Sequence, residues 1–168
     1  NSTVSNPQNL ASDSLACITV TNVSSTDGTY TAGQSVNIFV MFSSPVNVTG
    51  RPTLLLETGT TNKKAIFPAI AADGGSGTNT LKFIYTVETG DSSIHLDYVS
   101  IYALELNGGS ITGAVGDATL ILPKPGDLGS LGGNNNIIID NNLDPSTLSI
   151  ARQTPNSAST NSDTLTFR

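Results

Sequence analysis

The sequence predicts an all-β protein whose antiparallel strands form a two-layer sandwich, and three observations support this fold class. Apolar and polar residues alternate with a period of two in several segments, as in strands with one buried face. These segments recur about every 8–12 residues, with Gly, Pro, Asn and Asp between them. No stretch of about ten residues shows a helical period without a Gly or Pro break.

The clearest strand covers residues 78–87, which read TNTLKFIYTV. Its alternate apolar side chains are expected to face the core: Leu81, Phe83, Tyr85 and Val87. The positions between them, such as Lys82 and Thr86, are expected to face outward. Ile84 is the apolar exception on the outer face, and we expect a neighbouring loop to cover it.

Four more strands are expected in the first half of the chain, and one of them is the short apolar run of residues 53–57 (TLLLE). Residues 15–23 (LACITVTNV) form a β-branched run, and residues 35–42 (SVNIFVMF) alternate more regularly. The second of these is expected to end at Pro45, because proline cannot donate to a strand ladder. The same property of Pro68 predicts that residues 63–70 form an edge strand.

The second half contributes shorter strands and longer loops. Short strands are expected at residues 94–98, 101–106, 110–114, 118–122 and 136–140. Residues 72–77 (ADGGSG) predict a mobile loop, and residues 123–133 (PKPGDLGSLGG) predict a long turn-forming loop. Both loops are rich in Gly and able to adapt to a ligand.

Composition divides the chain into four parts. Residues 1–14 are polar and aperiodic, which predicts an arm or linker, and residues 15–140 predict the sandwich. Residues 141–145 (NNLDP) predict a linker, and residues 146–168 predict the truncated start of a second β module. The chain begins with Asn rather than Met, so we expect a piece of a longer protein.

The charge pattern bears on the class of partner. The net charge is −6 and the seven Lys and Arg are scattered, whereas nucleic-acid binding needs a concentrated basic face. An anionic membrane surface would repel such a chain, and no run of about 18 apolar residues predicts a membrane span. We therefore expect neither nucleic-acid binding nor membrane insertion, while an acidic, hydroxyl-rich surface is compatible with divalent cations.

No residue pattern predicts an enzyme. Cys17 has no second cysteine to pair with, and we expect it to be a small buried residue of the first strand. His95 is the single histidine, and nothing in the sequence places it near Cys17. Glu57 and Glu88 lie near strand ends as a conceivable carboxylate pair, but tryptophan, the usual sugar platform, is absent.

Several motifs occur in an order that resembles a known family. They are GTYTAGQ, a strand ending in SPV, TLLLETG, YTVETGD, LDYVS, LNGGSI and the closing NNNIIID. Together they make residues 16–140 similar to a bacterial-type Ig-like (cadherin-like) repeat, which occurs in tandem in very large surface and adhesin-like proteins. The resemblance implies an Ig-like, cadherin-like antiparallel β-sandwich, followed here by the stub of another module.

The same resemblance implies a calcium site in the linker. Cadherin-type linkers hold Ca²⁺ with an Asp/Asn cluster ending in Pro, and Asp140, Asn142 and Asp144 precede Pro145 in this way. Asp97 resembles an acidic position of a second cadherin motif, although Val99 occupies the place of its usual acidic partner. The alternative is an ordinary polar turn.

The expected function is structural. The resemblance implies one extracellular, cell-surface repeat of an adhesin or filament protein, acting as a spacer beside neighbouring repeats. One alternative is a module whose end loops bind a glycan or a protein. Another is a filament subunit that adds residues 148–152 and 164–167 to a neighbour's sheet. Asn22 and Asn47, like Asn1, fit the N-glycosylation pattern, which would matter only in a eukaryotic secreted protein.

Overall fold

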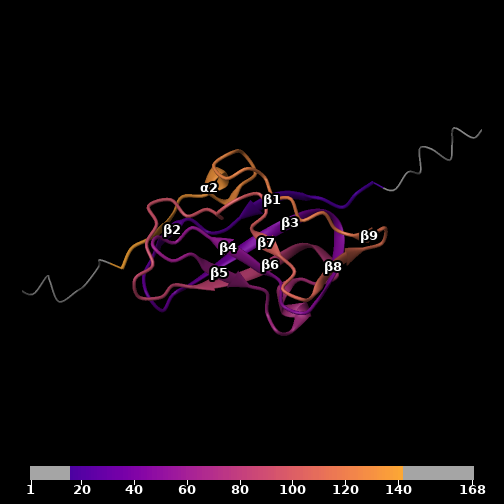
Figure 1. The fold of residues 1–168 in the computed structure, drawn as a ribbon, viewed down its shortest axis with the longest axis horizontal. Coiled ribbons are helices and arrows are strands. Elements are labelled where there is room, and N and C mark those ends of the chain that lie inside the picture. The colour runs from indigo at the N-terminus through magenta and orange to yellow at the C-terminus, as the bar shows by residue number, and fades with distance from the viewer. Residues whose placement is uncertain (1–15, 142–168) are drawn as a thin grey trace, which may run out of the picture.

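The computed structural model describes residues 16–141, and these form a mostly antiparallel all-β fold, which confirms the predicted fold class (Figure 1). The strands of the first half are β1 (Val20–Ser24), β2 (Gly28–Tyr30), β3 (Ser35–Thr49), β4 (Thr53–Leu56), β5 (Lys63–Ile66) and β6 (Thr78–Thr86). Those of the second half are β7 (Leu104–Glu105), β8 (Ser110–Gly113), β9 (Gly116–Asp117) and β10 (Ile137–Ile139). The short helical elements are η1 (Ala71–Gly74) and α2 (Leu131–Asn134).

Two sheets organise these strands. The larger has eight strands in the order β7-β4-β5-β6-β3-β8-β9, with β1 paired to β3 beside that path. The smaller joins β10 to β2 in parallel, whereas the paired strands of the larger sheet are antiparallel. The second strand and the last strand of the described chain therefore meet in one small sheet.

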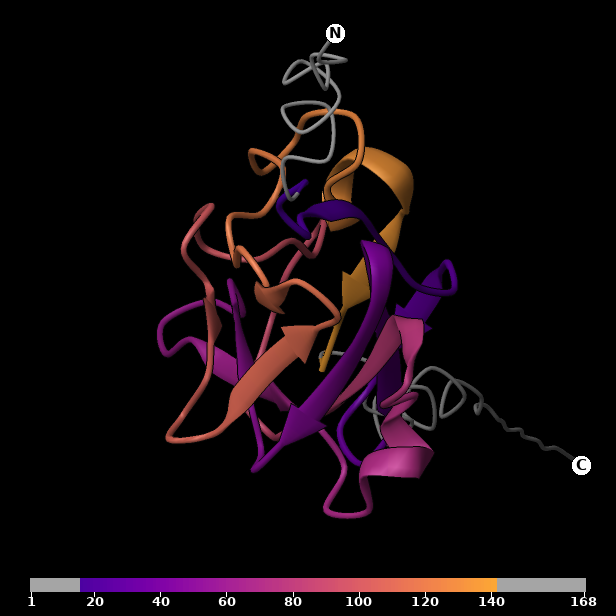
Figure 2. The same ribbon diagram turned by 90° about the vertical axis from the view of Figure 1, so that its right-hand side faces the viewer.

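Strand β3 is the longest and runs through the middle of the fold (Figure 2). Its first half pairs with β1 and β6, and its last residues pair with β8. The predicted end at Pro45 was wrong, because β3 continues through it to Thr49. The register with β6 shifts between Met41 and Val46, and such an irregularity tolerates a proline that has no N–H to donate.

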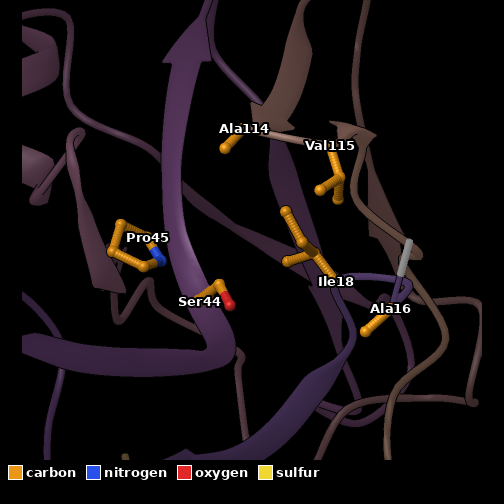
Figure 3. A pocket seen from close by; sticks show the side chains of 6 residues that line it. All are labelled: Ala16, Ile18, Ser44, Pro45, Ala114 and Val115. Carbon is orange, nitrogen blue, oxygen red and sulfur yellow. The ribbon is translucent and has the colours of Figure 1, made fainter. Parts of the chain in front are cut away.

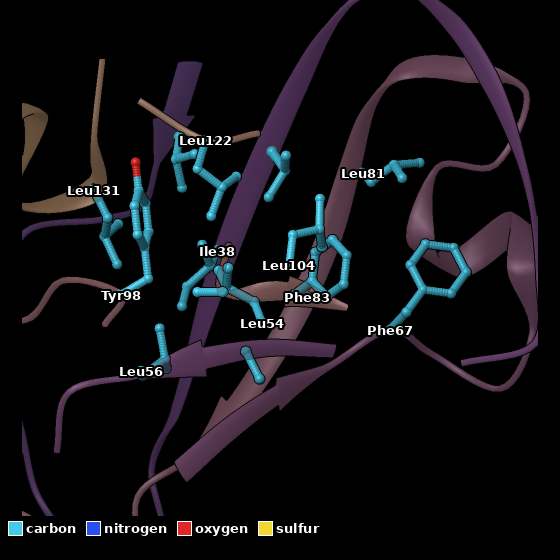
Figure 4. Close-up of a cluster of buried hydrophobic side chains, with 14 of the residues drawn as sticks. Ile38, Leu54, Leu56, Phe67, Leu81, Phe83, Tyr98, Leu104, Leu122 and Leu131 are labelled. Carbon is cyan, nitrogen blue, oxygen red and sulfur yellow. The ribbon is translucent and has the colours of Figure 1, made fainter. Parts of the chain in front are cut away.

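The core forms where side chains of β3 and β6 meet those of β4 and β7 (Figure 4). The inward face predicted for residues 78–87 is confirmed, because these four side chains are buried: Leu81, Phe83, Tyr85 and Val87. Ile84 was expected under a loop, but it is half-buried and lies opposite Ile66 of β5. The apolar residue on the outer face of β6 therefore lies at the position where β6 pairs with β5.

Strand β5 corrects a second expectation. Residues 63–66 lie between β4 and β6 rather than at a sheet edge, and Pro68 follows the strand without interrupting a ladder. Its two lysines form ion pairs: Lys63 with Glu88, and Lys64 with Glu105 at 2.9 Å. One pair joins β5 to Glu105 of β7, and the other joins it to Glu88 in the turn after β6.

Several local expectations were also wrong. Cys17 is exposed and precedes β1, which begins only at Val20. Residues 94–98 and 118–122 form no named strand, and the 72–77 segment contains part of η1. Gly74 of η1 lies so close to Phe67 that an added Cβ would be 2.3 Å from the ring. The segment is therefore held against the core.

The 123–133 loop, predicted from its turn residues, includes the first part of α2. The Ser130 hydroxyl accepts from the N–H of Gly133 at 2.9 Å and so caps this short helix. Within residues 16–141, no helix has the length and apolar character needed to cross a bilayer.

Candidate functional site

The junction of β2 and β10 ties the beginning of the described fold to its end. Beyond the paired residues, Gly28 donates its N–H to the carbonyl of Asn136, and Asp140 donates its N–H to the carbonyl of Tyr30 at 3.0 Å. The Asp27 carboxylate accepts from the side chain of Asn135 at 2.7 Å and from the N–H of Asn136. These two hydrogen bonds lower the pKa of Asp27.

Asn141, which follows β10, holds three backbone groups with one side chain. Its Oδ1 accepts from the N–H of Ala32 at 2.7 Å. Its Nδ2 donates to the carbonyls of Glu88 and Asp91, at 2.9 and 2.8 Å. We call this set of three bonds the terminal clamp. It fastens the point where the chain leaves the fold to two turns from distant parts of the sequence.

Beneath the terminal clamp lies a buried carboxylate. Asp91 is 3% exposed, and its Oδ2 accepts from the phenol of Tyr85 at 2.7 Å and from the N–H of Glu88. Burial raises the pKa of Tyr85, and the hydrogen bond to Asp91 raises it further. The Nζ of Lys63 lies 3.9 Å from Asp91 Oδ1, and its hydrogen bond to Glu88 raises the pKa of the lysine.

Asp97 organises the 123–133 loop. Its Oδ2 accepts from the N–H of Gly126 at 2.8 Å and from the hydroxyl of Ser130 at 3.1 Å. Gly132 lies against the same carboxylate, where an added Cβ would be 2.7 Å from Oδ2. The ring of His95 bonds through Nε2 to the carbonyl of Gly132. The carboxylate of Asp97 thus satisfies two donors of this loop, and one of them, the Ser130 hydroxyl, is buried.

The structure separates the two described residues of the predicted calcium site. Ser93 exchanges both backbone bonds with Ile139, and Leu96 donates its N–H to the carbonyl of Ile137. Asp97 therefore lies toward the opposite end of β10 from Asp140. Within residues 16–141, no three His, Cys, Asp or Glu residues gather as a metal-holding group. Asn142 and Asp144 lie outside the described residues.

The remaining candidates are dispersed. Asn22 is half-buried and its Oδ1 accepts from Asn134 at 2.8 Å, whereas Asn47 is exposed on β3; Asn1 lies outside the described residues. His95 bonds to Gly132 in the loop, and Cys17 lies before β1. Glu88 of the conceivable carboxylate pair is bound to Lys63.

Comparison of the chain with protein-family models, with curated proteins and with solved structures gave no match. The likeness to Ig-like repeats stays a prediction. The functional argument therefore depends on geometry.

Two apolar pockets flank the chain ends of the described fold. One, of about 390 Å³, is lined by Ala16, Ile18, Ser44, Pro45, Ala114 and Val115 (Figure 3). The other, of about 240 Å³, is lined by Ser92, Ser93, Ile94, Ile138, Ile139 and Asp140, and we call it the C-terminal pocket. Each pocket adjoins a point where the chain enters or leaves the described structure.

Sequence reasoning missed the residues that build this end of the fold. Asn141 was interpreted as part of a linker, and Asp91 stands beside Gly90 as an ordinary turn residue would. The only signal was the concentration of amides, three before β10 and two close after it. Amide side chains donate and accept together, so they can fasten a short strand that has few ladder bonds of its own.

Proposed function

We propose that this domain is a structural spacer of an extracellular surface protein, held in series with neighbouring modules. The observation that carries the proposal is the parallel pairing of β2 with β10. Figure 1 shows the indigo start and the orange end of the described chain at opposite ends of the long axis. A chain that enters and leaves in this way transmits tension lengthwise through the domain.

The parallel arrangement determines how tension loads the hydrogen bonds. Pulling on the chain before β1 draws β2 toward its own N-terminal end, and pulling after β10 draws β10 toward its C-terminal end. Parallel neighbours then slide past one another, so their bonds are loaded together rather than opened one at a time. The antiparallel pairing of β1 with β3 and the terminal clamp add bonds along the same route.

Force spectroscopy on single molecules tests this role. The 168-residue chain is placed between handle domains of known unfolding force and stretched from its two ends. We expect a distinct unfolding peak, whose force falls in Asn141→Ala because that variant loses the terminal clamp. The matched control is Asn62→Ala, at an exposed position in the turn between β4 and β5. Extension without a force peak would contradict the spacer role.

A binding module is the second candidate, and one observation favours it. Leu128 is 91% exposed in the 123–133 loop, which Asp97 and Ser130 hold in a fixed shape. A large apolar side chain on a well-held loop is suited to contact a protein or the apolar face of a sugar. A glycan array and a Leu128→Ser variant test this candidate, and signals that survive the substitution would count against this loop.

A further inference from the structure

The C-terminal pocket has an exposed apolar rim. Ile94 is 90% exposed, and Ile138 beside it is half-buried. Covering an exposed aliphatic side chain is favourable because its apolar surface is removed from water. The pocket, of about 240 Å³, is large enough to receive side chains from another segment.

Both edges of β10 already have backbone partners near the pocket. One edge pairs with β2, and on the other Ser93 both donates to and accepts from Ile139, at 3.0 and 2.8 Å. Ser92 also donates its N–H, to the carbonyl of Thr58 at 3.0 Å. An incoming segment therefore finds no free strand edge on β10, and it would bind through side chains seated on the apolar rim.

We propose that residues 146–152 of this chain dock on the C-terminal pocket. The terminal clamp fixes Asn141 at the exit, and Asp140 itself lines the pocket, so the following chain starts at its rim. Residues 142–145 (NLDP) are turn formers that let the chain reverse. Leu148 and Ile150 then follow at alternate positions, so an extended chain presents both on one side.

The distance is short enough for this docking. The seven residue-to-residue steps from Asn141 to Leu148 span at most about 25 Å when the chain is extended. A reversed chain therefore reaches the pocket with length to spare. The inference does not depend on the spacer role, since docking within one chain needs no tension and no neighbouring module.

Hydrogen–deuterium exchange on the full chain tests the docking. Exchange is followed by mass spectrometry in peptides that cover residues 146–152. We expect amides there to exchange at least about tenfold more slowly than in the isolated peptide, the order expected for burial of one aliphatic side chain. Ile94→Ser should remove most of this protection. The matched control is Leu128→Ser, because Leu128 is equally exposed but does not line the pocket.

A double-variant cycle supplies the second measurement. If Ile150 seats against Ile94, the melting-temperature losses of Ile94→Ser and Ile150→Ser should be less than additive when combined. Peptide-like exchange of residues 146–152 in the unmodified chain would overturn the proposal. So would protection that survives Ile94→Ser, since the segment would then be held elsewhere. Protection that grows with protein concentration would assign the pocket to a second copy instead.

Discussion

The phenol of Tyr85 donates a hydrogen bond of 2.7 Å to the carboxylate of Asp91, and both side chains are buried. Tyr85 is a buried residue of β6 that carries a polar group. Asp91 belongs to the turn beneath the terminal clamp. The bond therefore joins the central sheet to the end of the domain. It also gives a buried carboxylate the donors that it needs, together with the N–H of Glu88.

Stability should fall steeply in alkaline solution. Burial raises the pKa of Tyr85 and of Tyr98, so the folded protein keeps both protons above pH 10, where tyrosines of the unfolded chain lose theirs. The free energy of unfolding is then fully retained below about pH 10 and declines as the pH rises beyond that value. Urea unfolding between pH 8 and 11 measures the decline.

The double variant Tyr85→Phe/Tyr98→Phe is the control for this prediction. It should be less stable at pH 8 by about 1–3 kcal/mol, because the hydroxyl partners Asp91 and Pro123 lose a donor. The free energy of unfolding of this variant should decline less steeply above pH 10. Part of the decline that is left comes from Lys63, because its raised pKa also makes stability fall as the pH rises. An unchanged slope would show that these tyrosines do not control alkaline unfolding.

Thr53→Val should stabilise the protein. Thr53 is 4% exposed, and within residues 16–141 its hydroxyl has no hydrogen-bond partner. Valine has nearly the same shape and carries no hydroxyl to desolvate, so we expect a gain of about 0.5–1.5 kcal/mol. The contrasting variant is Thr58→Val, where a buried hydroxyl donates to the carbonyl of Thr61 at 2.9 Å. Denaturant midpoints should move in opposite directions.

Asp97→Ala should cost about 2–3 kcal/mol of stability. The substitution leaves the buried Ser130 hydroxyl and the N–H of Gly126 without their carboxylate acceptor. Asp117→Ala on the exposed β8–β9 hairpin removes the same charge and is expected to be nearly neutral. Equal losses in the two variants would indicate a general charge effect instead of a specific role in the loop.

Calcium binding at the linker is a proposal with a direct test. Asp140, Asn142 and Asp144 would supply oxygen ligands, whereas Asp97 is engaged with the 123–133 loop. Ca²⁺ at 100 times its dissociation constant should stabilise the folded chain by about 2.7 kcal/mol. A thermal melt in Ca²⁺ and in EGTA measures this shift, which Asp144→Asn should reduce. Identical melting temperatures in the two buffers would contradict calcium binding at the linker.

The period of two along residues 78–87 was enough to predict the buried face of β6, and the same period predicted that of residues 35–42. Both strands have one face against the core, so burial follows directly from alternation. Cys17 shows where this reasoning fails, because β-branched neighbours indicate an extended chain but do not set where pairing begins. Likewise, Pro45 ended the predicted strand, but a register shift accommodates it.

The candidate site was less predictable. Asp97 and Asp140 are both aspartates near the end of a predicted strand. In the structure Asp97 accepts hydrogen bonds from the 123–133 loop, whereas Asp140 directly follows β10 and donates its N–H to Tyr30. Asn141 resembles its neighbour Asn142 in type, and only its position against Ala32, Glu88 and Asp91 makes it the terminal clamp. A side chain's partners depend on which distant segments the fold brings beside it.

By itself, the sequence determined that this chain builds its core from strands and which faces of the long strands are buried. Alternation is a local pattern. Successive side chains of a strand point to opposite faces, so the pattern determines which face is apolar whatever the rest of the molecule does. The tertiary structure alone decided that β10 joins β2 in parallel and that Asn141 fastens the exit. Pairing between residues about 110 positions apart leaves no local pattern, because its free energy comes from contacts that exist only after the chain has closed on itself.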